Sequence, residues 1–187
     1  MRKLKMHLHI SLDGYASDAA GGFHWVTYND QIAARAKQLT ANADAVVFGP
    51  KTYKGMQGYW PSVPNDPDAT PGERAHADWI AHATKIVVST SLPEAEASWE
   101  TSLLLRDPAE LTAIKQQPGG DIVSFGSPLL VRSCLERGLI DELHLFLNPI
   151  LLGGGQAVFG SGVQSKLRLL EATPLPDGVV ALTYTPN

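Results

Sequence analysis

The chain opens with an alternation of apolar and polar residues that predicts a β-strand. Between residues 5 and 12, apolar side chains alternate with His7, His9 and Ser11. A period of two places successive side chains on opposite faces of a strand, so one face is expected to be buried. Asp13-Gly14 follows and is typical of a turn.

Apolar residues at helical spacing predict a helix over 27–43, with Thr27 and Asp30 forming a capping box at its start. Further helices are predicted at 50–56 and 73–82, from the cap signal Asp107-Pro108-Ala109-Glu110 onward, and from Pro128 to Gly138. The proline-rich stretch 58–72 is predicted to be a long loop of limited flexibility. Such a long connection favours a binding role.

Short apolar runs at 45–48, 85–89, 121–125 and 142–147 predict buried strands, and the runs 167–172 and 179–185 predict a terminal hairpin. Strands that alternate with helices require crossover connections. The predicted fold class is therefore α/β, with a mixed, mostly parallel central sheet flanked by helices and a C-terminal antiparallel hairpin.

Length and composition fit a single domain over residues 1–187, with 44% hydrophobic and 18% charged residues. The formal net charge of −4 provides no basic surplus for phosphates, so we expect no nucleic-acid partner. There is neither a secretory signal pattern nor an apolar run of the ~20 residues that a membrane span needs. We therefore expect a cytoplasmic protein that does not bind membranes.

Three predicted strand-to-helix junctions carry glycine or small polar residues, at 48–52, 88–91 and 125–128. In open α/β sheets, ligands bind beyond the carboxyl ends of the strands. Helix starts at that edge offer free N–H groups and a partial positive charge to phosphate. Several such junctions on one sheet suit a dinucleotide, although each taken alone is also explained as an ordinary capped turn.

The order of sequence blocks resembles the reductase half of the bacterial riboflavin-biosynthesis deaminase/reductase, the RibD C-terminal domain family. The blocks are Ser11-Leu12-Asp13-Gly14, 48–53, 85–92, 120–127, 138–143 and Pro149-Ile150-Leu151-Leu152-Gly153-Gly154-Gly155. They run over nearly the whole chain. The resemblance implies the dihydrofolate-reductase-like fold, a reductase activity and a homodimer formed through sheet-edge or C-terminal elements.

The resemblance also implies a bound NADPH. Its predicted contacts are Gly49, Lys51, Thr52, Ser89, Thr90, Ser91, Phe125, Gly126, Ser127 and Leu129. Relatives carry Arg after the glycine of the Gly49 block, where it can hold the 2′-phosphate. Pro50 stands there in this chain, so NADH remains open as the cofactor.

Hydride transfer to a C=N or C=O bond also needs a proton, and the candidate donors are Asp13 and Asp30. Both have structural explanations, Asp13 as a turn residue and Asp30 as a capping residue. Ser11, Trp25 and Tyr28 are the candidate substrate contacts. His7 and His9 share a strand face, but no third ligand is suggested, so no metal site is expected.

These observations predict an NAD(P)H-dependent reductase of a small heterocyclic or carbonyl substrate, resembling 5-amino-6-(5-phosphoribosylamino)uracil reductase. Dihydrofolate reductase activity remains an alternative. A non-catalytic nucleotide-binding protein that retains the fold is the alternative from another class.

Overall fold

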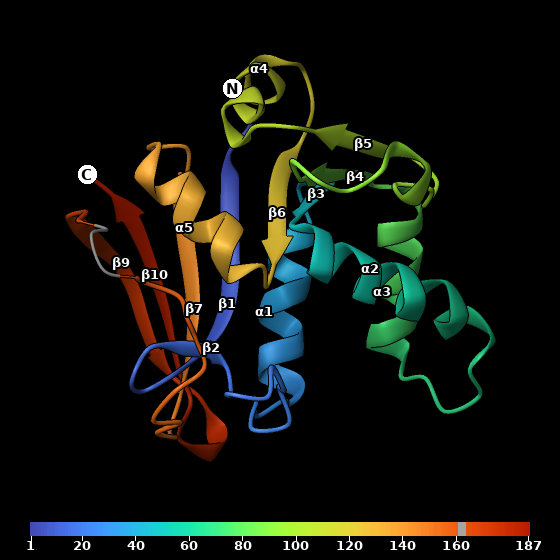
Figure 1. The fold of residues 1–187 in the computed structure, drawn as a ribbon. Coiled ribbons are helices and arrows are strands. Elements are labelled where there is room, and N and C mark those ends of the chain that lie inside the picture. Colours follow the sequence, from blue (N-terminus) through green and yellow to red (C-terminus); the bar gives the residue numbers. More distant parts are fainter. Residues whose placement is uncertain (161–163) are drawn as a thin grey trace.

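A computed structural model describes residues 1–160 and 164–187 and shows one eight-stranded sheet (Figure 1). Its strand order is β5-β4-β3-β6-β1-β7-β10-β9. The strands are β1 Leu4–Ser11, β3 Ala43–Phe48, β4 Thr84–Val88, β5 Ser102–Leu105, β6 Asp121–Phe125, β7 Glu142–Asn148, β9 Leu167–Pro174 and β10 Val180–Pro186. A second sheet pairs β2 Tyr15–Ser17 with β8 Gln156–Ala157.

The predicted fold class is confirmed. All pairings from β5 to β7 are parallel, whereas β10 pairs antiparallel with both β7 and β9. The sequence did not reveal β5, β2 and β8, because these strands have only two to four residues. So short a segment shows too few alternations for a period of two to be recognised.

The α helices are α1 Asp30–Thr40, α2 Pro50–Tyr59, α3 Pro71–His82, α4 Leu111–Gln116 and α5 Pro128–Glu136. The predicted first helix was too long at both ends, and the capping box of Thr27 and Asp30 is wrong. Asn29 is the N-cap, and its side chain accepts a hydrogen bond from the Ile32 N–H. Ala43 at the other end belongs to β3 because it already pairs with Asp121 of β6.

The proline-rich stretch 58–72 is more regular than predicted. It holds a 3₁₀ helix, Trp60–Asn65, and the first residues of α3. Proline fits the first turn of a helix, where its missing N–H costs nothing. Prolines that suggested a loop therefore mark two helix starts.

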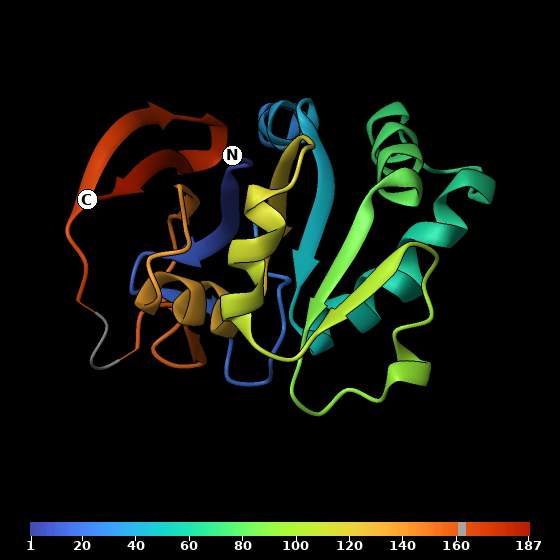
Figure 2. The same cartoon turned by 90° about the horizontal axis from the view of Figure 1, so that it is seen from above.

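The helices form layers on the two faces of the sheet. α4 and α5 cover one face, and α1 and α3 cover the other (Figure 2). On β1, Met6 and Leu8 are buried in the cluster that includes Val131 and Cys134 of α5. The opposite face of β1 carries the two histidines. The predicted alternation is confirmed, but the expectation of a single buried face is wrong, because His7 and Ser11 on the other face are 6% and 0% exposed. Leu12, beyond the last residue of β1, is 60% exposed.

The parallel strands bring several junctions to a single edge. β3, β6, β1 and β7 are neighbours that run in the same direction, so their carboxyl ends lie together. α2 follows β3 directly and α5 follows β6 after one short turn. None of the helices in the described residues is long and apolar enough to span a membrane.

Candidate nucleotide and substrate site

The starts of α2 and α5 lie side by side at the carboxyl edge. Both have proline at the first helical position, and neither has a side chain that caps it. The N–H groups of Lys51 and Thr52, like those of Leu129 and Leu130, have no acceptor among the described residues. Unsatisfied donors at helix starts favour an anion.

A hydrogen bond joins these two helix starts. The Gly49 N–H donates to Ser127 Oγ at 3.0 Å. A Cβ placed on Gly126 would lie 3.7 Å from Thr52 Cγ2, so little separates this turn from α2. Gly126 and Ser127 both have positive φ, 80° and 60°, which is uncommon for a serine. The predicted cofactor residues Gly49, Thr52, Gly126 and Ser127 are therefore brought together.

The Ser89–Ser91 turn lies at the end of β4, next to β3 in the sheet. The predicted contact Ser89 has a structural task, because its Oγ accepts hydrogen bonds from the N–H groups of Ser91 and Leu92. Thr90 and Ser91 are exposed. The end of the strand was predicted correctly, but the helix expected after 88–91 is wrong, because only the 3₁₀ turn Glu94–Glu96 separates this segment from β5. The two free hydroxyls are those of Thr90 and Ser91.

Sequence reasoning missed Arg106, an exposed cation that follows β5. Its Nη1 donates to the carbonyl oxygens of Ser89 and Leu92, at 3.1 and 2.7 Å, and so fixes the guanidinium beside the Ser89–Ser91 turn. The missing signal was β5 itself. Without that strand, nothing in the sequence placed Arg106 at this edge.

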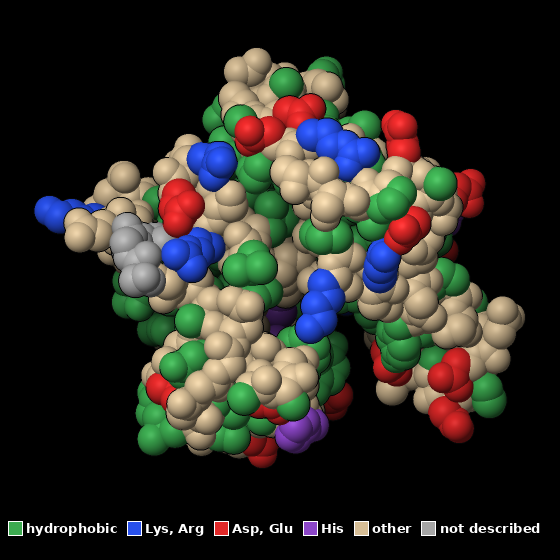
Figure 3. Space-filling view, in the orientation of Figure 1, with side chains coloured by type: hydrophobic (Ala, Val, Ile, Leu, Met, Phe, Trp, Pro, Cys, Tyr) green, Lys and Arg blue, Asp and Glu red, His purple; other side chains and the backbone are tan. Residues whose placement is uncertain are grey.

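The loop after β2 reaches the start of α2. A Cβ placed on Gly21 would lie 3.3 Å from Lys51 Nζ, so the exposed Lys51 side chain lies against this loop. The Asp18 carboxylate holds the loop by accepting from the N–H groups of Ala20 and Gly22. Figure 3 shows a hollow on this face of the molecule, with a Lys or Arg side chain at its rim and a histidine side chain deep inside it.

The sequence blocks and the fold agree with a comparison against known protein families. The family model described as the RibD C-terminal domain matches residues 2–181. The chain belongs to this family. A curated relative is the uncharacterized protein YyaP of Bacillus subtilis (strain 168), which is 24% identical over 98% of this chain and 94% of its own length.

Two solved structures show the same fold. A putative riboflavin biosynthesis protein from Shewanella sp. PV-4 has a TM-score of 0.72 and 21% identity, with 99% of each chain covered. A dihydrofolate reductase from Enterococcus faecalis, complexed with NADP(H), has a TM-score of 0.64 and 15% identity over 99% of this chain and 96% of that one. The predicted RibD C-terminal domain and dihydrofolate-reductase-like fold are therefore confirmed.

In this family member, Asp13 anchors a loop. Its carboxylate accepts from the Ser11 hydroxyl at 2.6 Å and from the N–H groups of Leu152 and Gly153, at 3.1 and 2.7 Å. These hydrogen bonds, that of Ser11 first, lower the pKa of Asp13 below its ordinary value. A carboxylate with a lowered pKa is ionised at neutral pH, which argues against Asp13 as a proton donor.

The other predicted contacts occupy different positions. Asp30 is exposed in the first turn of α1, and Tyr28 beside it is 67% exposed. Trp25 is half-buried and donates from Nε1 to the Gly22 carbonyl oxygen at 3.1 Å. Ser11 is fully buried, and its hydroxyl also accepts from the Tyr15 N–H. The side chains of Trp25 and Ser11 are thus engaged in hydrogen bonds within the chain, whereas those of Asp30 and Tyr28 face solvent.

Phe125 and Leu129 lie on opposite sides of the Gly126 turn. Leu129 is 62% exposed at the start of α5. The Phe125 ring, at the end of β6, contacts the rings of His7 at 5.3 Å and His76 at 5.3 Å. His76 belongs to α3, so this aromatic wall extends from the strands to that helix. No three His, Cys, Asp or Glu side chains within residues 1–160 and 164–187 are placed to hold a metal ion.

Proposed function

We propose that this protein is an NADPH-dependent reductase of a small heterocyclic or carbonyl compound. The observation that carries the proposal is the pair of uncapped helix starts, α2 and α5, joined by the bond from Gly49 to Ser127. Four unsatisfied N–H groups in one place suit the pyrophosphate of a dinucleotide. Membership of the RibD C-terminal domain family supports the reductase activity.

The residues present fit this cofactor. Gly126 has no Cβ, which leaves its backbone open to close approach by a phosphate. The exposed Leu129 offers an apolar surface next to the free N–H groups. Thr90, Ser91 and Arg106 would hold the adenosine end along the same edge, where they follow β4 and β5, two and three strands away from β6 and the start of α5.

Arg106 supports a preference for NADPH over NADH. Pro50 removes the arginine that relatives carry in the Gly49 block, but β5 brings another guanidinium to the same edge. Two carbonyl oxygens hold Nη1 of Arg106, which leaves its remaining N–H groups for a phosphate. In the proposed complex, Arg106 binds the 2′-phosphate together with the hydroxyls of Thr90 and Ser91.

NADPH, when bound, supplies two electrons as a hydride to the carbon of a C=N or C=O bond, and the heteroatom of that bond takes up one proton. The chain's residues hold the reactants at the carboxyl ends of β1 and β6. Asp13 positions the 152–153 segment against the turn after β1. Because Asp13 is held in its ionised form, we assign the proton to water rather than to this carboxylate.

Calorimetric titration of the full chain with NADPH, NADH and inorganic pyrophosphate tests the cofactor assignment. We expect NADPH to bind most tightly and to raise the melting temperature, since a ligand that binds only the folded state must stabilise it. The absence of any heat or thermal shift with millimolar NADPH and NADH would reject the proposal. Oxidation of NADPH, followed by its absorbance with the ribosylaminouracil phosphate or with dihydrofolate, then separates the enzymatic alternatives.

One further feature supports the predicted homodimer. β9 forms one edge of the sheet and pairs only with β10 among the described strands. Leu169 and Leu170 on this edge are 50% and 47% exposed. An exposed apolar edge strand is a template for pairing with another chain. Light scattering during size exclusion measures the mass, and Leu170→Lys is expected to shift the protein to the monomer.

A further inference from the structure

His7 and His9 occupy successive positions on one face of β1, and the reductase machinery described above leaves their side chains without a role. Both rings lie on the face covered by α1 and α3. His7 is only 6% exposed. The His9 ring stacks on Phe146 of β7, with centroids 5.0 Å apart and planes 29° apart. The His7 ring meets Phe146 edge-on at 4.9 Å.

Each histidine has one buried ring nitrogen without a hydrogen-bond partner, His7 Nε2 and His9 Nδ1. They are the only such side-chain atoms recorded among the described residues. A buried polar atom without a partner costs about 1–3 kcal/mol, so native proteins keep few of them. Two on adjacent same-face positions indicate a place where a ligand supplies the missing partners.

The histidine pair adjoins the proposed cofactor site. The Gly126 N–H donates to the His7 carbonyl oxygen at 2.9 Å, which ties β1 directly to the turn that starts α5. His9 lies two residues before Ser11, the last residue of β1. The rings therefore line the sheet just below the edge where a nicotinamide would end, on the side of α1.

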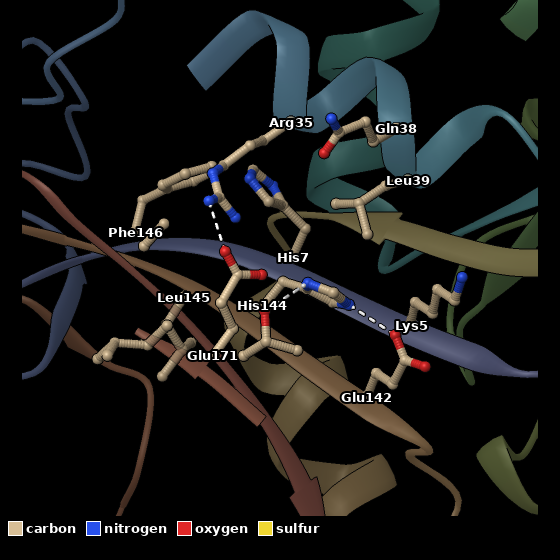
Figure 4. A pocket seen from close by; sticks show the side chains of 13 residues that line it. Lys5, His7, Arg35, Gln38, Leu39, Glu142, His144, Leu145, Phe146 and Glu171 are labelled. Atoms are coloured by element: carbon tan, nitrogen blue, oxygen red, sulfur yellow. Dashed lines mark hydrogen bonds and ion pairs between the residues drawn. The ribbon is translucent and has the colours of Figure 1, made fainter. Parts of the chain in front are cut away.

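On the side of the C-terminal hairpin, no group of the chain forms a hydrogen bond with His7 Nε2. A cavity of about 190 Å³ lies there between α1 and the hairpin, and several of the charged groups that line it are paired (Figure 4). Arg35 reaches from α1 to Glu171 of β9 at 2.6 Å. His144 bonds to Glu142 at 3.0 Å and to the Thr183 hydroxyl at 3.2 Å. Charged groups on this side are therefore already committed.

The aromatic rings in contact with the two histidines carry no formal charge at neutral pH. Burial lowers the pKa of His9 and of His76 to about 4, and it lowers the pKa of His7 well below its ordinary value. The remaining ring neighbours are Phe125 and Phe146. A charged ring would lose its hydration here without gaining a counter-ion.

We propose that His7 and His9 hydrogen-bond the reducible ring of the substrate and select an uncharged, planar carbonyl or imine compound. This inference rests on the proposed reductase function. A neutral imidazole donates from one nitrogen and accepts at the other, so the pair can serve a carbonyl oxygen or a ring N–H. His9 is the stronger determinant because its ring is the nearer of the two to the carboxyl edge.

The test uses isatin, an uncharged planar dicarbonyl heterocycle, and isatin-5-sulfonate, which adds one negative charge to the same ring. Binding is measured calorimetrically on the full chain saturated with NADP⁺, so that no turnover occurs. We expect isatin to bind roughly tenfold or more tightly than the sulfonate. Nitrogen-15 spectra of the histidine side chains should show shifts at His7 and His9 on binding of isatin.

Variants locate the interaction. His9→Phe keeps the stack on Phe146 and removes the hydrogen bond, and it should weaken isatin about tenfold without changing NADP⁺ affinity. His9→Gln, which retains an amide donor and acceptor, should recover most of that loss. His82→Phe, at an exposed histidine on α3, is the matched control and should leave isatin affinity unchanged.

The possible outcomes distinguish failure of the proposed reductase function from failure of the roles assigned to His7 and His9. Failure of NADP⁺ to bind rejects the proposed function, and the assignment of the histidines falls with it. If NADP⁺ binds, the histidine assignment alone is overturned by any of three results. The first is that isatin and isatin-5-sulfonate bind with equal affinity or do not bind at all. The second is that the nitrogen-15 signals of His7 and His9 do not shift when isatin is added. The third is that His9→Phe binds isatin with an affinity within twofold of wild type. The spectra of the wild-type chain decide the question even if a variant fails to fold.

Discussion

The helix starts of this protein fall into two kinds. α1 and α3 begin with side-chain caps, Asn29 and Thr70, and α4 continues a 3₁₀ turn capped by Asp107. α2 and α5 begin with Gly-Pro and Ser-Pro and have no such cap. All of these sequences can start a helix, so helix formation does not explain the difference. The caps Asn29 and Thr70 each accept the third N–H of their own helix, whereas the uncapped pair leaves the corresponding N–H groups of Thr52 and Leu130 for something outside the chain.

Placing a carboxylate at one of the uncapped helix starts should cause the largest loss of dinucleotide affinity. Leu129→Asp places an acid in the first turn of α5, where it competes for the free N–H groups and repels a pyrophosphate. We expect affinities for both NADPH and NADH to fall roughly tenfold or more. The variant should nevertheless be as stable as wild type or more stable, by about 0.3–1 kcal/mol, because an acid suits a helix start.

The neutral variant Leu129→Asn is the control for the size and polarity of the new side chain. It should weaken NADPH far less than the aspartate does. Calorimetry and urea unfolding measure the two quantities separately. An NADPH affinity within twofold of wild type for Leu129→Asp would mean that the start of α5 does not hold the pyrophosphate.

Arg106 provides a second test of the uncapped helix starts, because at the same edge of the sheet it would bind the cofactor through a side chain rather than through backbone N–H groups. We expect Arg106→Gln to weaken NADPH about tenfold and to leave NADH unchanged, since only NADPH carries the 2′-phosphate. Leu129→Asp, in contrast, should weaken both dinucleotides. Equal losses for NADPH and NADH in Arg106→Gln would show that the guanidinium acts only through the turn that it fixes.

The same contrast explains how far the sequence could be interpreted. Gly49-Pro50 and Gly126-Ser127-Pro128 were sufficient to predict both helix starts, because these residues act locally. Arg106 was missed because its position depends on a four-residue strand, β5. Asp13 lies in the predicted turn after β1 and Ser89 at the predicted end of a strand, but their hydrogen bonds to backbone groups depend on turn geometry. The burial of the two histidines follows from α1 and α3, which a strand pattern cannot show.

Removing a side-chain cap should lower the free energy of unfolding without changing the affinity for the nucleotide. Thr70 Oγ1 accepts from the Glu73 N–H at the start of α3, and Thr70→Ala is expected to lower the free energy of unfolding by about 1 kcal/mol. NADPH affinity should stay within about twofold, because the Thr70 hydroxyl already accepts the Glu73 N–H and α3 is not one of the two paired, uncapped starts. Urea unfolding and calorimetry measure the two effects. A loss of NADPH affinity comparable to that of Leu129→Asp would contradict the distinction between the two kinds of start.

The smallest expected effect is a pH dependence confined to the capped start of α3. The Thr70 N–H and hydroxyl donate to the Glu73 carboxylate at 2.8 and 2.7 Å, and these bonds hold the pKa of Glu73 below its ordinary value. A lowered carboxyl pKa stabilises the fold above the unfolded-state value, and this contribution is lost as the pH falls through the folded-state pKa. Between about pH 5 and pH 3, wild type should therefore lose more unfolding free energy than Glu73→Gln. The difference should be a few tenths of a kcal/mol, because Glu73 is solvent-screened. Urea unfolding of both proteins across this range measures it, and parallel curves would show that the carboxylate contributes nothing to the cap.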